Sequence, residues 1–495
     1  MENKDLQKKF ISNLVFLLIM NLLIKPYWIL GIDRGVQNSV GAENYGLYVI
    51  LFDFSFIPSI LLDIGITNFN NKNIAQNNHL VTKHFSNIMA LKLLLGIVYF
   101  IVCFTVGYWS GYDKQAMHLL YFLGINQFLI YFIIYLRSNL AGLHLFSIDS
   151  VVSVLDRSIM IILASCLLHI PFFQPYFSIE AFLYVQTIAY FLTACITTVL
   201  VAKKAKFRKL NWNFPFFIVI LKKSFPYAIL VLLMTLYNRL DKVMMGHLLP
   251  NKEGEFQSGI YAYAFRILEA ANMIAFLFAG LLLPIFSRMI AQKESVEQLV
   301  KLSYTLLFTA ASTVSILCFF FSADIMQLLY KEHTDLSAEV FQFLMFCFTA
   351  ISMTYIFGTL LTAKGEMKLL NGMAIGGILI NISLNLILIP IYKAKGAAIS
   401  SLVTQYVTAI AQIILATWVF KFRINKKLLV RTFLFVAGLA SFCYGVKMLS
   451  FPVIVTSIPF LIPFTLCTLF ALIWSIAVGL IKIRAMLRIL KYGWN

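Results

Sequence analysis

The residues of this sequence whose chemistry stands out are charged side chains inside long apolar runs. They are the cations Lys25, Arg239 and Arg266 and the acids Asp53, Asp241 and Glu269. A charge at the centre of a bilayer costs about 2.5–3.5 kcal/mol on insertion scales, so such a side chain usually faces a cavity or a partner. We therefore treat the three cations as candidate binding residues for an anionic ligand, and the three acids as candidate cavity or ion-coupling residues.

Depth in the membrane groups four of these side chains. At about 1.5 Å of rise per residue, Asp53 lies roughly 12 Å and Arg266 roughly 10 Å below the outer ends of their expected helices. Lys25 falls in the outer half of the first expected helix, and Arg239 falls near the outer end of the seventh. We predict that these four side chains line one cavity that opens outward.

Each acid in this group has a structural alternative. Loss of hydration near mid-membrane favours the protonated form of a carboxylate, and no basic residue lies within one helical turn of Asp53. Asp53 is therefore the candidate for ion-linked protonation, and its alternative is a bond to a neighbouring helix. Arg266 and Glu269 share a helix face, so they form either a self-neutralising pair or a cavity arginine tuned by the glutamate.

The other charges in expected helices have simpler explanations. Asp63 falls near the inner end of its helix, and we expect both Asp63 and Lys92 to extend toward the membrane interface. Asp156 and Arg157 are adjacent and do not face each other on a helix. We expect one of these two to bridge to another helix.

Several classes of chemistry lack their motifs here. The sequence has no G-x-x-x-x-G-K-[ST] phosphate loop, no H-E-x-x-H and no G-x-S-x-G. Its seven histidines are scattered without metal-ligand spacing, and its seven cysteines lie in apolar runs, where they suit buried packing rather than disulfides. We therefore expect no cofactor, no metal and no ATP hydrolysis, and we do not expect an enzyme.

The composition indicates which elements hold these charges. Of the 495 residues, 61% are hydrophobic and 12% are charged, and the mean hydropathy is +0.86. A spanning helix needs about 20 mostly apolar residues. We predict an all-α integral membrane protein with about 14 transmembrane helices, at residues 10–32, 45–66, 85–109, 117–139, 150–170, 178–202, 217–246, 259–285, 299–321, 338–362, 369–391, 396–420, 429–449 and 452–481.

The basic residues indicate the orientation of the helices. With the N-terminus in the cytoplasm, 27 Lys and Arg residues fall in inside segments and 7 in outside segments, as the positive-inside rule requires. Topology and contact with anionic lipids thus account for the net charge of +19. We expect both termini to be cytoplasmic and no nucleic-acid partner.

Two basic loops, at residues 203–223 and 421–431, divide the chain. We predict a six-helix lobe over 1–210, a second six-helix lobe over 211–425, and two extra helices with a basic tail over 426–495. Paired bundles that face a central cavity are a common plan of transporters. The prediction therefore places a central cavity between the two lobes.

The lobes share a weakly repeated motif. In the first, Asp33-Arg34 precedes Gly46-Leu47-Tyr48. In the second, Asp241-Lys242 precedes Gly259-Ile260-Tyr261. In both, an acid-base pair ends an expected odd-numbered helix and Gly-x-Tyr opens the next.

Three stretches, taken in order, carry a resemblance to a known family. They are Gly41-Ala-Glu-Asn-Tyr-Gly46-Leu-Tyr48 with Leu62-Asp63-Ile-Gly65-Ile; Asn238-Arg-Leu-Asp241 with Gly259-Ile-Tyr-Ala-Tyr-Ala-Phe-Arg266-Ile and Leu283-Pro284-Ile-Phe-Ser287; and Asn381-Ile-Ser-Leu-Asn385 with Ile389-Pro390 and Gly396-Ala-Ala398. The sequence thereby resembles the polysaccharide exporter family, the Wzx-type O-antigen flippases. That family belongs to the multidrug/oligosaccharidyl-lipid/polysaccharide superfamily, with the MATE multidrug pumps and the lipid II flippase.

The resemblance implies a flippase in a bacterial inner membrane. It would carry an undecaprenyl-diphosphate-linked oligosaccharide, an O-antigen or capsule repeat unit, to the periplasmic leaflet by alternating access. The implied partners are this substrate, membrane lipids, a coupling H⁺ or Na⁺, and glycan-assembly proteins. Arginine suits phosphate, so the candidate cations fit the diphosphate, although they are fewer than the lipid II flippase resemblance implies. A lipid II flippase, a cation-coupled multidrug pump and a membrane-embedded glycan polymerase or ligase are the alternatives.

Overall fold

The computed structural model describes residues 20–21, 23–24, 26–67, 70, 74, 79–143, 145–207, 209–250, 252–423, 425–449 and 460–481. The chain forms two compact units, residues 1–259 (unit 1) and 260–495 (unit 2). The lobe boundaries expected from the basic loops stay a prediction.

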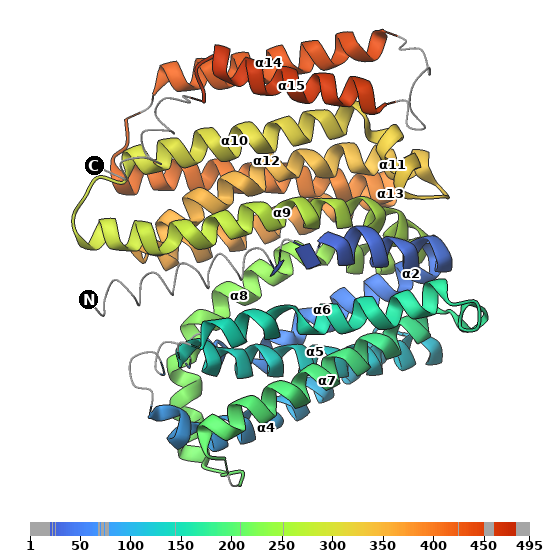
Figure 1. Ribbon diagram of the computed structural model, residues 1–495, viewed down its shortest axis with the longest axis vertical. Coiled ribbons are helices and arrows are strands. Elements are labelled where there is room, and N and C mark those ends of the chain that lie inside the picture. Colours follow the sequence, from blue (N-terminus) through green and yellow to red (C-terminus); the bar gives the residue numbers. More distant parts are fainter. Residues whose placement is uncertain are drawn as a thin grey trace. The chain divides into compact units, whose positions relative to one another are not determined.

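Unit 1 is a bundle of long helices. Its elements are η1 (Trp28–Asp33), α2 (Arg34–Phe56), η2 (Ile57–Leu62), α4 (Leu80–Trp109), α5 (Lys114–Gly142), α6 (Phe146–His169), η3 (Gln174–Tyr176), α7 (Ile179–Ala205), α8 (Phe214–Leu248) and the start of α9 (Glu253–Ala291). Helix α5 packs between α4, α6 and α7, and α2 packs on α5 and α8 (Figure 1). Buried rings such as Tyr99, Tyr135 and Phe182 fill the interior.

Side-chain caps explain where three of these helices begin. The Asp113 carboxylate accepts from the Ala116 backbone N–H at the start of α5, and the Ser178 hydroxyl accepts from the Ala181 N–H at the start of α7. Asn213 caps α8 in the same way. Such caps satisfy N–H groups that have no partner inside the helix.

Helix α2 is interrupted at Gly41. The φ of Gly41 is 79°, a conformation that glycine adopts without steric cost. The interruption falls in the connection that the sequence predicts between residues 32 and 45. Helical structure then continues to Leu62 in η2, and a turn follows at Asp63. Residues 10–19 of the first expected helix lie outside the described residues.

Unit 2 continues α9 and adds six helices among the described residues. They are α10 (Glu297–Phe320), α11 (Ser322–Leu329), α12 (Thr334–Lys364), α13 (Met367–Phe420), α14 (Lys426–Met448) and α15 (Leu461–Ala477). Helix α13 breaks at Lys393, whose φ is 52° and ψ −132°, between the expected helices 369–391 and 396–420. A Cβ at Gly396 would lie 2.2 Å from the Leu388 carbonyl oxygen, so this tight reversal requires glycine there.

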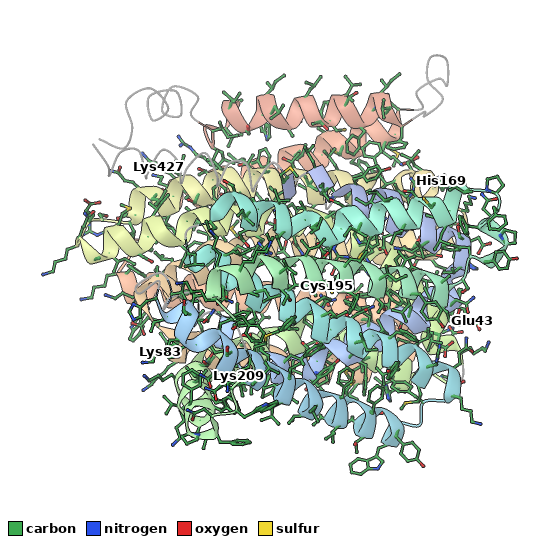
Figure 2. The ribbon with its side chains drawn as sticks, turned by 60° about the horizontal axis from the view of Figure 1, so that its bottom comes forward. Glu43, Lys83, His169, Cys195, Lys209 and Lys427 are labelled. Atoms are coloured by element: carbon green, nitrogen blue, oxygen red, sulfur yellow. The ribbon has the colours of Figure 1, made fainter. Side chains whose placement is uncertain are left out.

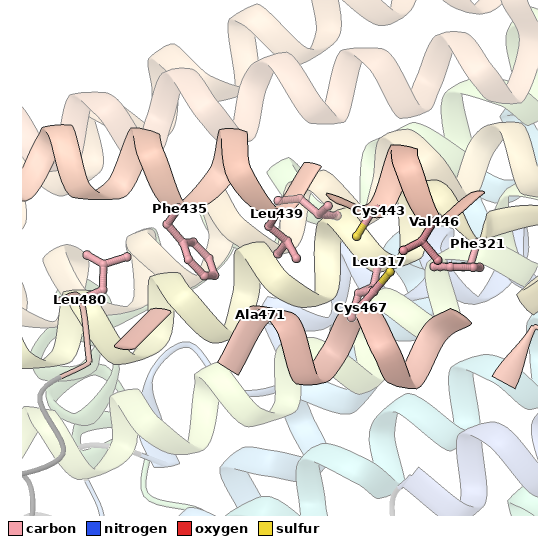
Figure 3. Close-up of a cluster of buried hydrophobic side chains, with 10 residues drawn as sticks. Leu317, Phe321, Phe435, Leu439, Cys443, Val446, Cys467, Ala471 and Leu480 are labelled. Atoms are coloured by element: carbon pink, nitrogen blue, oxygen red, sulfur yellow. The ribbon is translucent and has the colours of Figure 1, made fainter. Parts of the chain in front are cut away.

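Helices α14 and α15 lie side by side and pack on α10 (Figure 1). Their shared core contains Phe435, Leu439, Cys443, Cys467 and Ala471 (Figure 3). Both thiols are among those that remain free cysteines. The two extra helices are thus an integral part of unit 2.

Ten helices in the described part of the chain are long and apolar enough to cross a membrane, and the same residues contain no strand. The prediction of an all-α membrane protein is confirmed. Helix α8, which carries charges near both ends, is not among the ten. Figure 2 shows Lys83 and Lys209 at one end of unit 1 and Glu43 and His169 at the opposite end. Lys83 and Lys209 belong to segments predicted to lie on the cytoplasmic side, and Glu43 and His169 to segments predicted to lie on the outer side. Which end of the unit faces the cytoplasm stays a prediction.

Candidate functional site

A buried cluster of one carboxylate and two cations joins α2 to α8 within unit 1. Arg239 Nη1 donates to Asp53 Oδ1 at 2.8 Å, and Lys242 Nζ lies 2.7 Å from Asp53 Oδ2. Arg239 and Lys242 are three residues apart, so both leave the same face of α8. The Asp53 side chain is 0% exposed and that of Lys242 is 4% exposed, so the charges lie in an environment where ionic partners are required.

Arg239 is the most exposed member of the cluster. Its side chain is 20% exposed, and its guanidinium carbon lies 4.7 Å from the ring centre of Phe56 and 5.6 Å from that of Phe52. Both rings belong to α2 and flank Asp53 in the sequence. Helix α2 therefore holds the guanidinium with a carboxylate and two aromatic faces, which attract a cation.

Two glycines bring α2 into backbone contact with the start of α9. A Cβ at Gly46 would lie 1.7 Å from the Glu255 carbonyl oxygen, and a Cβ at Gly259 would lie 1.9 Å from the Ala42 carbonyl oxygen. No other residue type fits these positions without separating the helices. Gly46 and Gly259 open the two Gly-x-Tyr motifs, so the two copies of the repeated motif meet at one helix crossing.

The turn between α8 and α9 is also tightly packed. A Cβ at Gly254 would lie 2.7 Å from the Met245 carbonyl oxygen. On the surface beside this turn, Lys252 Nζ lies 2.5 Å from Glu43 Oε1 of α2. Both side chains are exposed, so this pair contributes little stability. The glycine contacts fix the spacing between α2 and the α8–α9 turn. This spacing in turn keeps Asp53 on α2 within bonding distance of Arg239 on α8.

A second buried ion pair lies directly after η2. Lys92 pairs with Asp63 and donates to the Leu62 carbonyl oxygen at 2.9 Å, and the Thr67 N–H donates to Asp63. The Lys92 side chain is 2% exposed. The expectation that Asp63 and Lys92 extend toward the interface is therefore wrong. Each is the partner of the other, and together they fix η2 against α4.

Arg157 confirms the expectation of a bridge to another helix. Its guanidinium carbon lies 5.3 Å from the ring centre of Trp28 in η1 and 5.9 Å from that of Tyr190 in α7. Its Nε also lies 3.8 Å from Asp156 Oδ2, a long contact between adjacent residues. The aromatic contacts thus connect Arg157 of α6 to η1 and α7.

Unit 2 contains the pair Arg266 and Glu269 on α9. Arg266 Nη1 donates to Glu269 Oε2 at 2.6 Å, and the two side chains are 18% and 25% exposed. The two side chains form the ion pair that their spacing of three residues predicts. The role of both residues in a cavity stays a prediction.

The structure brings four of the six predicted site residues together in two separate pairs, Asp53 with Arg239 and Arg266 with Glu269. Asp241 is buried at 4% exposure beside Lys242 on α8, and Lys25 lies outside the described residues. The structural alternative given for Asp53, a bond to a neighbouring helix, is confirmed, because both of its cations come from α8. Lys242 was not among the candidate binding residues, although its spacing of three from Arg239 could have identified it.

The donor set of the cluster suits an anion. Guanidinium and ammonium groups offer only donors, and they form short charge-assisted bonds to carboxylate or phosphate oxygens. In the described part of the chain, no three His, Cys, Asp or Glu side chains are placed to hold a metal ion.

The sequence profile of the polysaccharide biosynthesis protein family matches residues 34–290, more than half of the chain. The chain belongs to the polysaccharide biosynthesis protein family. The match to this family includes Asp53, Arg239, Lys242 and both crossing glycines. A MatE profile matches residues 226–387. A search of curated proteins finds no match to this family member.

Solved structures show that this polysaccharide biosynthesis family member has the fold of MOP superfamily transporters. The lipid II flippase MurJ, in an inward closed conformation, covers 95% of this chain and 100% of its own, with a TM-score of 0.70 and 13% identity. An inward-facing multidrug resistance MATE transporter covers 81% and 98%, with a TM-score of 0.63 and 13% identity. A MOP superfamily transporter from Pyrococcus furiosus covers 83% and 95%, with a TM-score of 0.60 and 15% identity.

Proposed function

We propose that the protein is a flippase for an undecaprenyl-diphosphate-linked oligosaccharide, such as an O-antigen or capsule repeat unit. It would carry this lipid from the cytoplasmic to the periplasmic leaflet of a bacterial inner membrane by alternating access. The observation that carries the proposal is the buried cluster on α8. Arg239 and Lys242 together offer a guanidinium and an ammonium on one helix face, which is the donor set that a diphosphate requires.

Family membership and fold support the same assignment. The matching family serves polysaccharide biosynthesis, and the lipid II flippase aligns with 95% of the chain, against 81% and 83% for the MATE and Pyrococcus furiosus transporters. The difference is close to the length of the segment that holds α14 and α15. The chain is thus closer in aligned length to this lipid flippase than to these two transporters.

The proposed transport cycle separates the two parts of the substrate. The polyprenyl tail stays in the hydrocarbon region, where burial is favourable, while the diphosphate and sugar cross beside the cations. The sequence has no phosphate loop for ATP, so a gradient of H⁺ or Na⁺, or consumption of the product outside, would drive the cycle. Both termini would be cytoplasmic.

Lipid II is the second candidate substrate. The specific observation in its favour is the alignment of the lipid II flippase over 95% of this chain. Lipid II and a lipid-linked repeat unit both carry a diphosphate, so the cation cluster suits both. Competition between the two lipids in one assay separates these candidates.

The test is flipping of a fluorescently labelled undecaprenyl-diphosphate oligosaccharide in proteoliposomes, read by an impermeant quencher. We expect the wild-type chain to expose the label faster than empty liposomes do, and Arg239→Ala to slow it. Arg137→Ala is the matched control, because Arg137 pairs with Asp149 at 2.7 Å elsewhere in unit 1 and should transport normally. A wild-type chain that gives no facilitation contradicts the proposal, and stronger inhibition by lipid II than by unlabelled substrate favours the second candidate.

A further inference from the structure

Asp53 takes the position that an anionic ligand of the α8 cations would take. One carboxylate oxygen accepts from Arg239 at 2.8 Å, and the other lies 2.7 Å from the Lys242 ammonium. Carboxylate and phosphate oxygens are equivalent acceptors for these donors. The carboxylate belongs to α2 and the cations to α8. The chain therefore carries its own anion in the candidate site, and that anion links two helices.

The exposure of the three side chains sets the order in which a ligand meets them. Asp53 and Lys242 are buried, whereas Arg239 is 20% exposed. An incoming phosphate therefore reaches Arg239 first. A diphosphate carries more negative charge than a carboxylate and offers several oxygens to the planar guanidinium fork. It can compete with Asp53 for Arg239 while Asp53 stays beside Lys242.

We propose that Asp53 is a resident counter-anion, which the diphosphate of the substrate displaces from Arg239. The inference rests on the proposed function and names the step that connects substrate binding to helix movement. In the empty protein, the Asp53–Arg239 bond holds α2 to α8. In the loaded protein, Arg239 binds phosphate, that bond is lost, and α2 is freer to move relative to α8.

Binding affinity is the first test, because it changes in opposite directions for the two roles of Asp53. Asp53→Asn keeps the shape of the side chain and removes its charge, so the competing anion is gone. We expect the full-length variant in detergent to bind geranylgeranyl diphosphate at least about fivefold more tightly than wild type, by calorimetry. A purely structural Asp53 gives weaker binding in the same variant. Asp149→Asn, which removes the charge of the carboxylate that pairs with Arg137, should leave the affinity unchanged.

A measurement without substitution at Asp53 keeps the proposal testable if that variant does not fold. Spin labels at Asn44→Cys on α2 and His247→Cys on α8 lie on exposed positions, in a chain whose seven native cysteines are replaced. Saturating geranylgeranyl diphosphate should change the distance distribution between the labels. An unchanged distribution overturns the loosening of α2.

The outcomes separate this inference from the proposed function. If wild type does not bind the diphosphate, or if Arg239→Ala binds it as well as wild type, the proposed function fails. If wild type binds it, Arg239→Ala weakens the binding and Asp53→Asn does not strengthen it, only the counter-anion role fails.

Discussion

Each unit holds an arginine–carboxylate pair, and the two pairs are built differently. In unit 1, Arg239 binds Asp53 on another helix, the carboxylate is 0% exposed, and Lys242 joins the pair. In unit 2, Arg266 binds Glu269 on the same helix, and both side chains are partly exposed. The ion pair of unit 2 joins two residues of one helix, so this bond by itself does not connect α9 to another element. A pair between helices makes the position of one helix depend on the ionic state of the other.

Removal of the carboxylate should show this difference most strongly. Asp53→Ala leaves two cations without their buried anion, and we expect it to lower the free energy of unfolding by about 3–5 kcal/mol, as for other broken buried pairs. Glu269→Ala leaves a partly exposed arginine and should cost far less. Thermal unfolding of both variants in detergent measures the contrast. Equal losses of stability would contradict the distinction between the two pairs.

We expect the next largest effect from a substitution at the contact between Gly46 and Gly259. This contact holds α2 at the distance from α8 at which Asp53 and Arg239 bond. Gly259→Ala places a Cβ 1.9 Å from the Ala42 carbonyl oxygen, and we expect it to cost about 1–3 kcal/mol, as overpacking usually does. Gly372→Ala in unit 2 is the matched control, since a Cβ there meets nothing within 4 Å. Thermal unfolding and the flipping assay should both be impaired only by Gly259→Ala. If the control is equally damaging, the close contact does not explain the loss.

The sequence predicted the elements better than the partners of the charges. Apolar runs of about 20 residues and their flanking lysines locate most helices, because each run carries its own signal. The partner of Asp53 lies 186 residues away, and a search within one helical turn cannot find it. The contact of Gly46 with Gly259 is similar. The motif repeat was visible in the sequence, but nothing in it says that the two copies touch.

Spacing along the sequence correctly predicted an ion pair where both partners lie on one helix. Arg266 and Glu269 are three residues apart and do form a pair. The same spacing rule applied to α8 would have placed Lys242 among the candidate binding residues together with Arg239. For Asp63 and Lys92, distance from the helix ends suggested contact with the interface, whereas tertiary packing made them partners.

Transport should separate the two arginines if the unit 1 cluster binds the diphosphate. We expect Arg239→Ala to slow flipping about tenfold or more, which corresponds to about 1.4 kcal/mol. Arg266→Ala should slow it less, because Glu269 already balances the charge of Arg266. Initial rates in proteoliposomes, corrected for the amount of inserted protein, give the comparison. A larger loss for Arg266→Ala would move the main binding cation to unit 2.

The smallest expected effect belongs to Glu269→Gln. The substitution removes the ionic partner of Arg266 but keeps a side chain of nearly the same size. Pairs of this spacing stabilise an isolated helix by only about 0.2–0.5 kcal/mol, so the midpoint of thermal unfolding should barely move. Asp53→Asn, which removes the charge of a fully buried carboxylate, should move it much more. If Glu269→Gln destabilises the protein as much as Asp53→Asn does, Glu269 fixes more than its own helix, and the contrast between the two pairs is lost.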